Sequence, residues 1–187
     1  MGSLYNLTNA AGAGSPYLQA GKNGLQSVGF AGATALVAPL YVNTGATQEV
    51  VMVAAFTNGT AKLVFQSPGA PAANHQLTAG GGLLQLKTGA TSVTGFSSLA
   101  NLANKFAVYN ILFQGGAGSV GNVVYTNGVS GTAANVSLAA TNMSGFYMTP
   151  QCPVAVLAMM TWTNRILTAA ERLAVYQYCT NRFGVMP

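Results

Sequence analysis

The chain has 187 residues, of which half are hydrophobic and only 5% are charged, against about 25% in an ordinary soluble domain. Its acidic residues are Glu49 and Glu171, and the lack of aspartate excludes most hydrolases, most metalloenzymes and the usual calcium sites. The length predicts one domain with a full core. The longest apolar runs, Val50–Phe56 and Val154–Met160, are too short for a membrane-spanning helix, which needs ~20 residues.

The net charge of +5 reflects the shortage of acids more than an abundance of bases. The lysines are scattered, and only Arg165, Arg172 and Arg182 fall in one region, whereas a nucleic-acid surface needs a basic cluster or stripe. The first residues, Met1 to Asn6, have neither the basic nor the apolar part of a signal peptide. We therefore expect a product that stays where it is made unless a separate machine or cell lysis releases it, with neither nucleic acid nor a membrane as its partner.

The chain begins with a stretch, residues 1–34, that is rich in glycine, alanine, asparagine and serine and shows no hydrophobic periodicity. This composition predicts an irregular segment with room for one short strand. Such a segment would wrap the domain or reach a neighbouring molecule as an arm.

From residue 35 to about 161 the pattern is one of short strands and turns, which is typical of a β-sandwich or barrel. Asn58-Gly59 between two β-rich runs predicts a type I′ hairpin, because both residue types tolerate positive φ. The expected strands are Ala35–Val42, Gln48–Phe56, Ala61–Gln66, Leu83–Lys87, Phe106–Phe113, Asn122–Thr126, Asn135–Leu138, Gly145–Met148 and Val154–Thr161.

The last thirty residues predict one helix over about 169–182. Thr168 and Glu171 have the spacing of a capping box, in which each side chain bonds the backbone amide of the other residue. Gly184 stands where a helix-ending glycine belongs. The face expected to point inward consists of Leu167, Ala174, Tyr178 and Cys179, closed by Phe183.

The C-terminal part resembles the end of laminin-G-like, concanavalin A-like jelly-roll domains. The stretch from Arg165 to Arg172 matches their pattern R-x-L-[ST]-x-x-E-R, and Phe183-Gly184 matches the helix-ending [YF]-G. Upstream, Tyr125-Thr126-Asn127-Gly128 is similar to the family's Y-x-N-G hairpin turn. The resemblance implies an all-β fold over residues 35–187: an antiparallel two-sheet jelly-roll sandwich with one short C-terminal α-helix.

This chain departs from the chemistry of that family. Many members bind calcium through aspartates, which are absent here. The glucanase branch uses closely spaced carboxylates, and glycoside hydrolysis needs two carboxyl groups within ~5–10 Å. Glu49 stands alone on its expected strand and Glu171 belongs to the helix cap, so we expect no enzyme activity and no catalytic, cofactor-binding or metal-binding residues.

Four further features are interpreted as structural and not as functional. Gly116–Gly121 fits G-x-G-x-x-G, but a strand follows it instead of the helix of a dinucleotide site, which indicates a turn. His75, the only histidine, is expected in a loop or on the surface. Cys152 and Cys179 lack the CxxC spacing of structural zinc sites, and we expect two buried thiols instead of a disulfide. The seven methionines are interpreted as core residues.

Four aromatic residues are candidates for a sugar-stacking platform, although aromatics at this density usually belong to the core. They are Trp162, Tyr125, Tyr147 and Tyr178.

Stand-alone jelly-roll domains of this kind resemble accessory proteins of tailed-bacteriophage virions. Surfaces of small polar side chains lose little side-chain entropy when an interface forms, which suits repeated protein contacts. The leading hypothesis is therefore a non-catalytic virion structural protein. It would be a capsid decoration or cement protein or a tail component, acting as a homo-oligomer on the major capsid protein. The alternative is a lectin-like carbohydrate-binding module of an adhesion device, with its glycan held near Trp162 or Tyr125.

Overall fold

The structure is a computed structural model, and all structural statements below concern the part of the chain that it describes. The described residues are 8–9, 17–30, 36–43, 48–56, 62–66, 75–80, 83–88, 91–92, 97–98, 102, 104–113, 123–131, 143–148, 154–163 and 165–185.

The described strands form two antiparallel sheets. Sheet A has the spatial order β1 (Thr8–Asn9), β4 (Leu36–Asn43), β14 (Met143–Met148), β6 (Lys62–Gln66), β7 (His75–Gly80), β8 (Leu83–Thr88) and β10 (Ser97–Ser98), with β9 (Thr91–Ser92) also paired to β8. Sheet B has the order β13 (Val129–Ser130), β12 (Val123–Thr126), β11 (Ala107–Phe113), β5 (Gln48–Phe56), β15 (Val154–Thr163), β3 (Gln26–Phe30) and β2 (Tyr17–Ala20).

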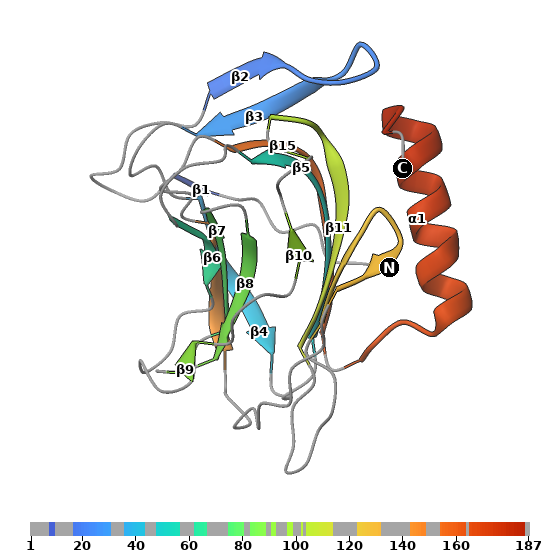
Figure 1. Ribbon diagram of the computed structural model, residues 1–187. Helices are drawn as coiled ribbons and strands as arrows, with labels where there is room; N and C mark the ends of the chain where they lie inside the picture. Colours follow the sequence, from blue (N-terminus) through green and yellow to red (C-terminus); the bar gives the residue numbers. More distant parts are fainter. Residues whose placement is uncertain are drawn as a thin grey trace.

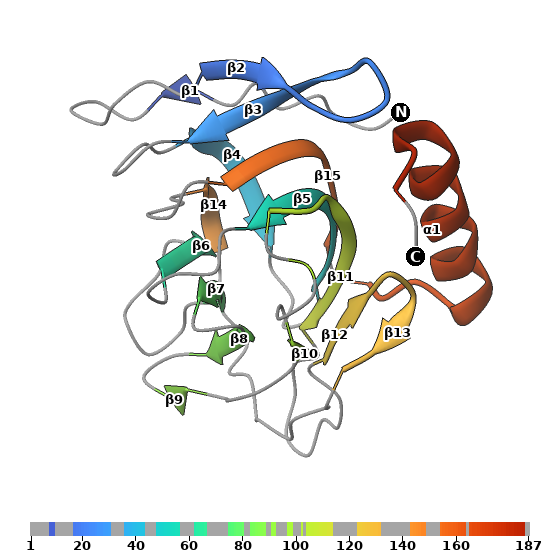
Figure 2. The same ribbon diagram turned by 45° about the horizontal axis from the view of Figure 1, so that its top comes forward.

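The two sheets face each other as layers, and helix α1 (Ala169–Phe183) lies on the outer face of sheet B (Figure 1). The view from a second direction keeps the helix outside the same sheet (Figure 2). This arrangement confirms the expected all-β, antiparallel two-sheet sandwich with a C-terminal helix.

Strand β5 lies at the centre of sheet B and is buried on both faces. Because side chains alternate along a strand, Val51 and Val53 share the face that packs with Cys179 of α1, whereas Val50 and Met52 share the opposite face. A strand covered on both faces is apolar throughout instead of alternating. This accounts for the unbroken hydrophobic run that the sequence places here.

Eight of the expected strands are present, each within two residues of its expected ends. The expected strand Asn135–Leu138 lies outside the described residues, as do Gly116–Gly121. The strand expected after that glycine-rich stretch is β12. At Asn127 and Gly128, φ values of 49° and 80° close a tight turn between β12 and β13, which confirms the Y-x-N-G hairpin.

The hairpin expected at Asn58-Gly59 is wrong, because β5 belongs to sheet B and β6 to sheet A. The chain therefore crosses between the layers at this point, and both residues of the pair lie outside the described part. A loop position for His75 is also wrong, since its backbone begins β7 opposite Thr88 of β8. In both cases the pairing within the sandwich overrides the local turn signal.

The N-terminal part is more regular than expected over residues 17–30. Strands β2 and β3 form an antiparallel hairpin, and β3 pairs with β15 in sheet B. The turn between them uses Asn23 and Gly24 with φ of 55° and 72°, values that these two residue types tolerate. Since the strands contain glycine, serine and glutamine, their pairing comes from the neighbouring strand and not from a hydrophobic pattern of their own.

Helix α1 begins and ends as the sequence predicts. The Thr168 hydroxyl accepts a hydrogen bond from the Glu171 amide, the Glu171 carboxylate accepts one from the Thr168 amide, and Gly184 has a left-handed φ of 61°. The other end is also held by the β2–β3 turn, where Asn23 Nδ2 donates to the Arg182 carbonyl at 3.2 Å.

The expected inward face of the helix is partly wrong. Leu167, Cys179 and Phe183 are buried, but Ala174 and Tyr178 are exposed. Residues three or four positions apart lie on the same face of a helix. The residues that contact sheet B have this spacing. These residues are Arg172, Val175, Tyr176, Cys179 and Phe183.

Burial between the helix and sheet B raises the pKa of the Cys179 thiol to about 11. Cys179 is a free, buried thiol, while Cys152 lies outside the described residues. None of the described helices is long and apolar enough to cross a membrane.

The helix cap predicts a pH dependence of stability. The amide of Thr168 and the guanidinium of Arg165 bind the Glu171 carboxylate and lower its pKa from 4.5 to about 2. Because the folded pKa is the lower one, this stabilisation is complete above pH ~4.5 and is lost as the pH falls toward 2. Urea unfolding of the wild type and Glu171→Gln over this range measures the effect. We expect the difference in the free energy of unfolding between the wild type and Glu171→Gln to shrink as the pH falls. A difference that stays constant with pH would contradict the account.

Candidate functional site

Glu49 is a carboxylate with no solvent exposure in the central strand of sheet B. Both of its oxygens accept hydrogen bonds: Oε1 from Asn110 Nδ2 at 2.8 Å and Oε2 from the Leu167 amide at 2.7 Å. The charge is met by Arg172, whose Nε lies 3.0 Å from Oε1 and whose Nη2 lies 3.3 Å from Oε2. Four hydrogen bonds thus satisfy a buried charge that would otherwise be very costly.

Arg172 reaches Glu49 from the first turns of α1 and joins three elements. Its Nη2 also donates to the Leu167 carbonyl at 2.9 Å, and its guanidinium lies 5.1 Å from the centre of the Tyr125 ring on β12. A guanidinium within about 6 Å of an aromatic face is attracted by the ring. The helix is therefore fixed to β5, to the segment before it and to the β12–β13 hairpin through one side chain.

These contacts explain the C-terminal sequence pattern. The amide of Leu167 donates to Glu49, and its carbonyl accepts from Arg172. Arg172, the second arginine of the pattern R-x-L-[ST]-x-x-E-R, supplies the positive charge that pairs with Glu49. The first arginine, Arg165, instead forms an exposed ion pair with Glu171 of the cap. One pattern thus contains a buried anchor and a surface pair.

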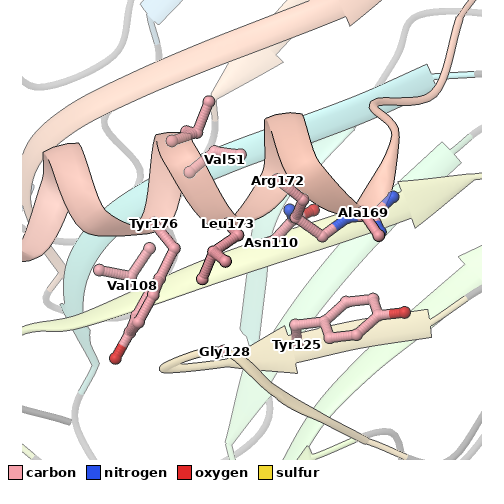
Figure 3. A pocket seen from close by; sticks show the side chains of 10 residues that line it. Val51, Val108, Asn110, Tyr125, Gly128, Ala169, Arg172, Leu173 and Tyr176 are labelled. Carbon is pink, nitrogen blue, oxygen red and sulfur yellow. The ribbon is translucent and has the colours of Figure 1, made fainter.

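A cavity of about 230 Å³ lies between α1 and the β12–β13 hairpin, and we call it the α1–hairpin pocket. Leu173 and Tyr176 reach from the helix toward the hairpin, while Tyr125 lies on β12 (Figure 3). Strand β11 contributes Val108 and Asn110 to the wall. The pocket is below the ~300–1,000 Å³ of sites for drug-sized ligands, so it suits a group the size of one ring.

Asn110 gives this mostly apolar wall a polar atom without a partner. The residue is 6% exposed, its Nδ2 is bound to Glu49, and its Oδ1 has no hydrogen-bond partner in the described structure. An unsatisfied buried acceptor costs about 1–3 kcal/mol. Because Oδ1 has less than 1 Å² of accessible surface, it is closed to a ligand in the pocket, and its unmade hydrogen bond is a cost to the fold.

Tyr109, the next residue of β11, is the other buried side chain with an unpartnered polar atom in the described structure. It points to the opposite face of the sheet, where its ring lies 5.0 Å from that of Phe56. Burial raises the pKa of its hydroxyl above the ordinary range. Tyr109 does not line the α1–hairpin pocket, so it is a core residue.

The expected aromatic platform is not formed. Tyr125 lines the pocket, but Trp162 is partly buried on β15 against the cluster beneath α1. Tyr147 lies on β14 in sheet A, and Tyr178 is an exposed helix residue set edge-on to Phe183. The four residues therefore belong to different parts of the sandwich, and only Tyr125 shares a site with the residues described above.

Sequence reasoning missed the Glu49–Arg172 pair and Asn110. Two features of the sequence could have pointed to the pair. Glu49 directly precedes the apolar run Val50–Phe56, and Arg172 lies on the helix face that packs on the sheet. Three-dimensional proximity joins Glu49 and Arg172 across 123 positions. The described residues contain no group of three histidine, cysteine or acidic side chains that would hold a metal ion.

Comparisons with known proteins bear on the fold. No family model and no curated protein sequence matches the chain. Among solved structures, the botulinum neurotoxin serotype G binding domain aligns with a TM-score of 0.70 and 10% identity, covering 94% of this chain and 47% of that one. The chain has a jelly-roll sandwich fold.

Two further structures concern the neurotoxin DC binding domain. The complex with SialylT matches with a TM-score of 0.66 and 10% identity, covering 92% of this chain and 46% of that one. The complex with rat synaptotagmin II matches with a TM-score of 0.67 and 9% identity, and the alignment covers 92% of this chain and 47% of that one. The chain thus spans about half the length of these structures. At this identity the likeness establishes the fold, not the ligand.

Loss of the Arg172 side chain should leave Glu49 buried without its counter-ion. We expect Arg172→Ala to lower the free energy of unfolding by about 3–5 kcal/mol in chemical denaturation. The matched control is Arg165→Ala, which removes a half-exposed ion pair and should cost less than about 1 kcal/mol. Equal losses in the two variants would show that the buried pair is no special anchor.

Proposed function

We propose that this protein is a non-catalytic, lectin-like binding domain that holds one saccharide ring in the α1–hairpin pocket. The observation that carries the proposal is the pocket itself, a ring-sized and mostly apolar cavity lined by two tyrosines. The jelly-roll fold is shared with the receptor-binding domain of botulinum neurotoxin type G and with the neurotoxin DC binding domain in complex with SialylT. This likeness supports a recognition role without naming the ligand.

The chemistry of the wall fits a sugar. A saccharide ring combines apolar C–H faces with hydroxyl donors, and it needs flat apolar surface as well as a few oriented polar groups. Tyr125, Tyr176 and Leu173 supply the first. Arg172, whose side chain is 18% exposed, supplies a polar group.

Both acidic side chains of the chain are engaged in holding the structure, which supports a non-catalytic role. Glu49 is bound by four donors, and Glu171 is bound to the helix cap and to Arg165. Acid–base catalysis of glycoside cleavage needs two carboxyl groups that face the substrate.

A glycan array with the purified chain tests this function, because it samples many saccharides at once. Ala169→Leu should fill part of the pocket and weaken the signal about tenfold or more, since the ligand and the added side chain compete for space. Ala170→Leu is the matched control: this alanine is also exposed in the first turn of α1 but does not line the pocket. An array without any saccharide signal, or equal losses in both variants, would contradict the proposal.

A second candidate is the capsid decoration or cement protein, and strand β2 favours it. This edge strand has no charged residue, and Leu18 is 66% exposed on it. Natural edge strands are usually protected by charge or proline, so an unprotected one suits pairing with another chain. In this role the protein would assemble in the host cytoplasm as a homo-oligomer on the major capsid protein, and its location would be the virion.

The two candidate functions differ in how the absence of this protein would affect the stability of a capsid shell. Capsid shells that lack the protein should disassemble at a lower temperature if it is a cement protein, and light scattering should show a stable oligomer. A monomer in solution that leaves shell stability unchanged would remove this second candidate.

A further inference from the structure

We propose that the α1–hairpin pocket binds an acidic sugar, a uronic acid whose carboxylate accepts hydrogen bonds from Arg172 Nη1. This inference rests on the proposed function and specifies the ligand of the same site. Three observations carry it: the unused donors of Arg172, the shortage of negative charge in the chain and the size of the pocket.

Arg172 uses only part of its guanidinium to hold the fold. Its Nε and Nη2 form one edge of the planar group and donate to the two oxygens of Glu49, and Nη2 also donates to the Leu167 carbonyl. These bonds engage the N–H of Nε and both N–H groups of Nη2, whereas a guanidinium has five N–H donors. The N–H groups of Nη1 are left over, and the planar geometry directs them away from the edge that binds Glu49.

Nη1 is accessible to a ligand. No described residue accepts a hydrogen bond from it, and the buried side-chain atoms without a partner in the described structure are those of Tyr109 and Asn110. A nitrogen that is neither bonded nor buried is in contact with solvent. Arg172 lines the pocket, and its guanidinium lies 5.1 Å from the centre of the Tyr125 ring on β12 (Figure 3). An acceptor that enters the pocket beside Tyr125 therefore finds donors already held in orientation.

The charge of the chain favours an anionic acceptor. Each of the two carboxylate side chains, Glu49 and Glu171, is already paired with an arginine. The net charge of +5 therefore belongs to the remaining basic residues, and such a field attracts anions. A carboxylate has two oxygens that match the N–H groups of arginine, and charged hydrogen bonds of this kind are about twice as strong as neutral ones.

Glu49 leaves room for a second carboxylate on the same guanidinium. It accepts four hydrogen bonds from Asn110, Leu167 and Arg172, which satisfy both of its oxygens. A ligand at Nη1 lies across the guanidinium from Glu49, so the cation stands between the two anions and attracts both of them. The buried pair that fixes the helix therefore stays intact when the ligand binds.

The size of the pocket decides how the acidic group is carried. A cavity of about 230 Å³ takes one ring and leaves no space for a long acidic substituent. The carboxylate must therefore be attached directly to the ring, as it is in a uronic acid. The apolar face of the same ring then packs on Tyr125, Tyr176 and Leu173 while the carboxylate reaches Arg172.

Nuclear magnetic resonance of the ¹⁵N-labelled full chain tests the inference with three methyl glycosides. The probes are methyl glucuronide, its primary amide and methyl glucoside, which share one ring and differ only in the group at carbon 6. We expect the glucuronide to shift the amide signals of Tyr125, Arg172 and Leu173. It should bind about tenfold more tightly than the other two at low salt, because only its bond to the arginine is formed between two charged groups.

Two controls accompany the titration. Raising the salt to about 0.5 M should reduce the advantage of the glucuronide, because the attraction between its carboxylate and the basic chain is screened. The amide signal of Leu84, which lies on β8 in sheet A, should stay in place with all three probes.

The outcomes separate this inference from the function on which it rests. Equal binding of all three glycosides in the pocket, or an amide that binds as tightly as the acid, would overturn the uronic acid assignment and leave saccharide binding in place. No shift of pocket signals with the glucuronide, together with an array signal for other saccharides that Ala169→Leu weakens, would likewise overturn the assignment alone. Silence in both experiments would overturn the assignment and the proposed function together.

Discussion

The Glu49–Arg172 ion pair is the constraint on which the arrangement of the C-terminal half depends. A carboxylate without solvent exposure in the central strand of sheet B must be neutralised and fully hydrogen-bonded, and the residues that do so come from β11, from the segment before α1 and from α1 itself. The helix thereby lies on sheet B in one position. Its far end is held by the β2–β3 turn through Asn23, so the helix is fixed at both ends.

The pocket is a consequence of the same contacts. Arg172 cannot move away from Glu49 without leaving a buried charge unpaired, and Tyr125 packs against the guanidinium from the hairpin side. Both residues form the wall of the α1–hairpin pocket. A pocket whose walls are fixed by contacts that also stabilise the fold is largely preformed, which suits binding by shape. This coupling connects the stability of the domain to the recognition role proposed for it.

Local signals in the sequence predicted much of the fold. The capping box at Thr168 and Glu171 and the Asn127-Gly128 turn depend on neighbouring residues alone, and both are where the sequence places them. The hydrophobic run of β5 also identifies a buried strand. Tyr17–Phe30 escaped prediction because its strands gain their pairing from β15, and Asn58-Gly59 misled because the chain changes sheets there.

The site was harder to predict than the fold. Three residues of the site are far apart in the sequence, and none stands out in its own segment. Glu49 is a polar residue near the start of a strand, Asn110 is a polar residue within a strand, and Arg172 is a basic residue in a helix. Only the pairing of β11 with β5 and the rotation of α1 bring them together. The aromatic residues chosen from the sequence were a poorer guide, because their number says nothing about which face of which sheet they occupy.

A double-mutant cycle between Glu49 and Arg172 tests the central claim most directly. It compares the free energies of unfolding of the wild type, Glu49→Leu, Arg172→Met and the double variant. The account predicts strong coupling, with the double variant about 2–3 kcal/mol more stable than the sum of the single losses implies. Losses that add within about 0.5 kcal/mol would contradict it, because they would mean that the two residues stabilise the domain independently.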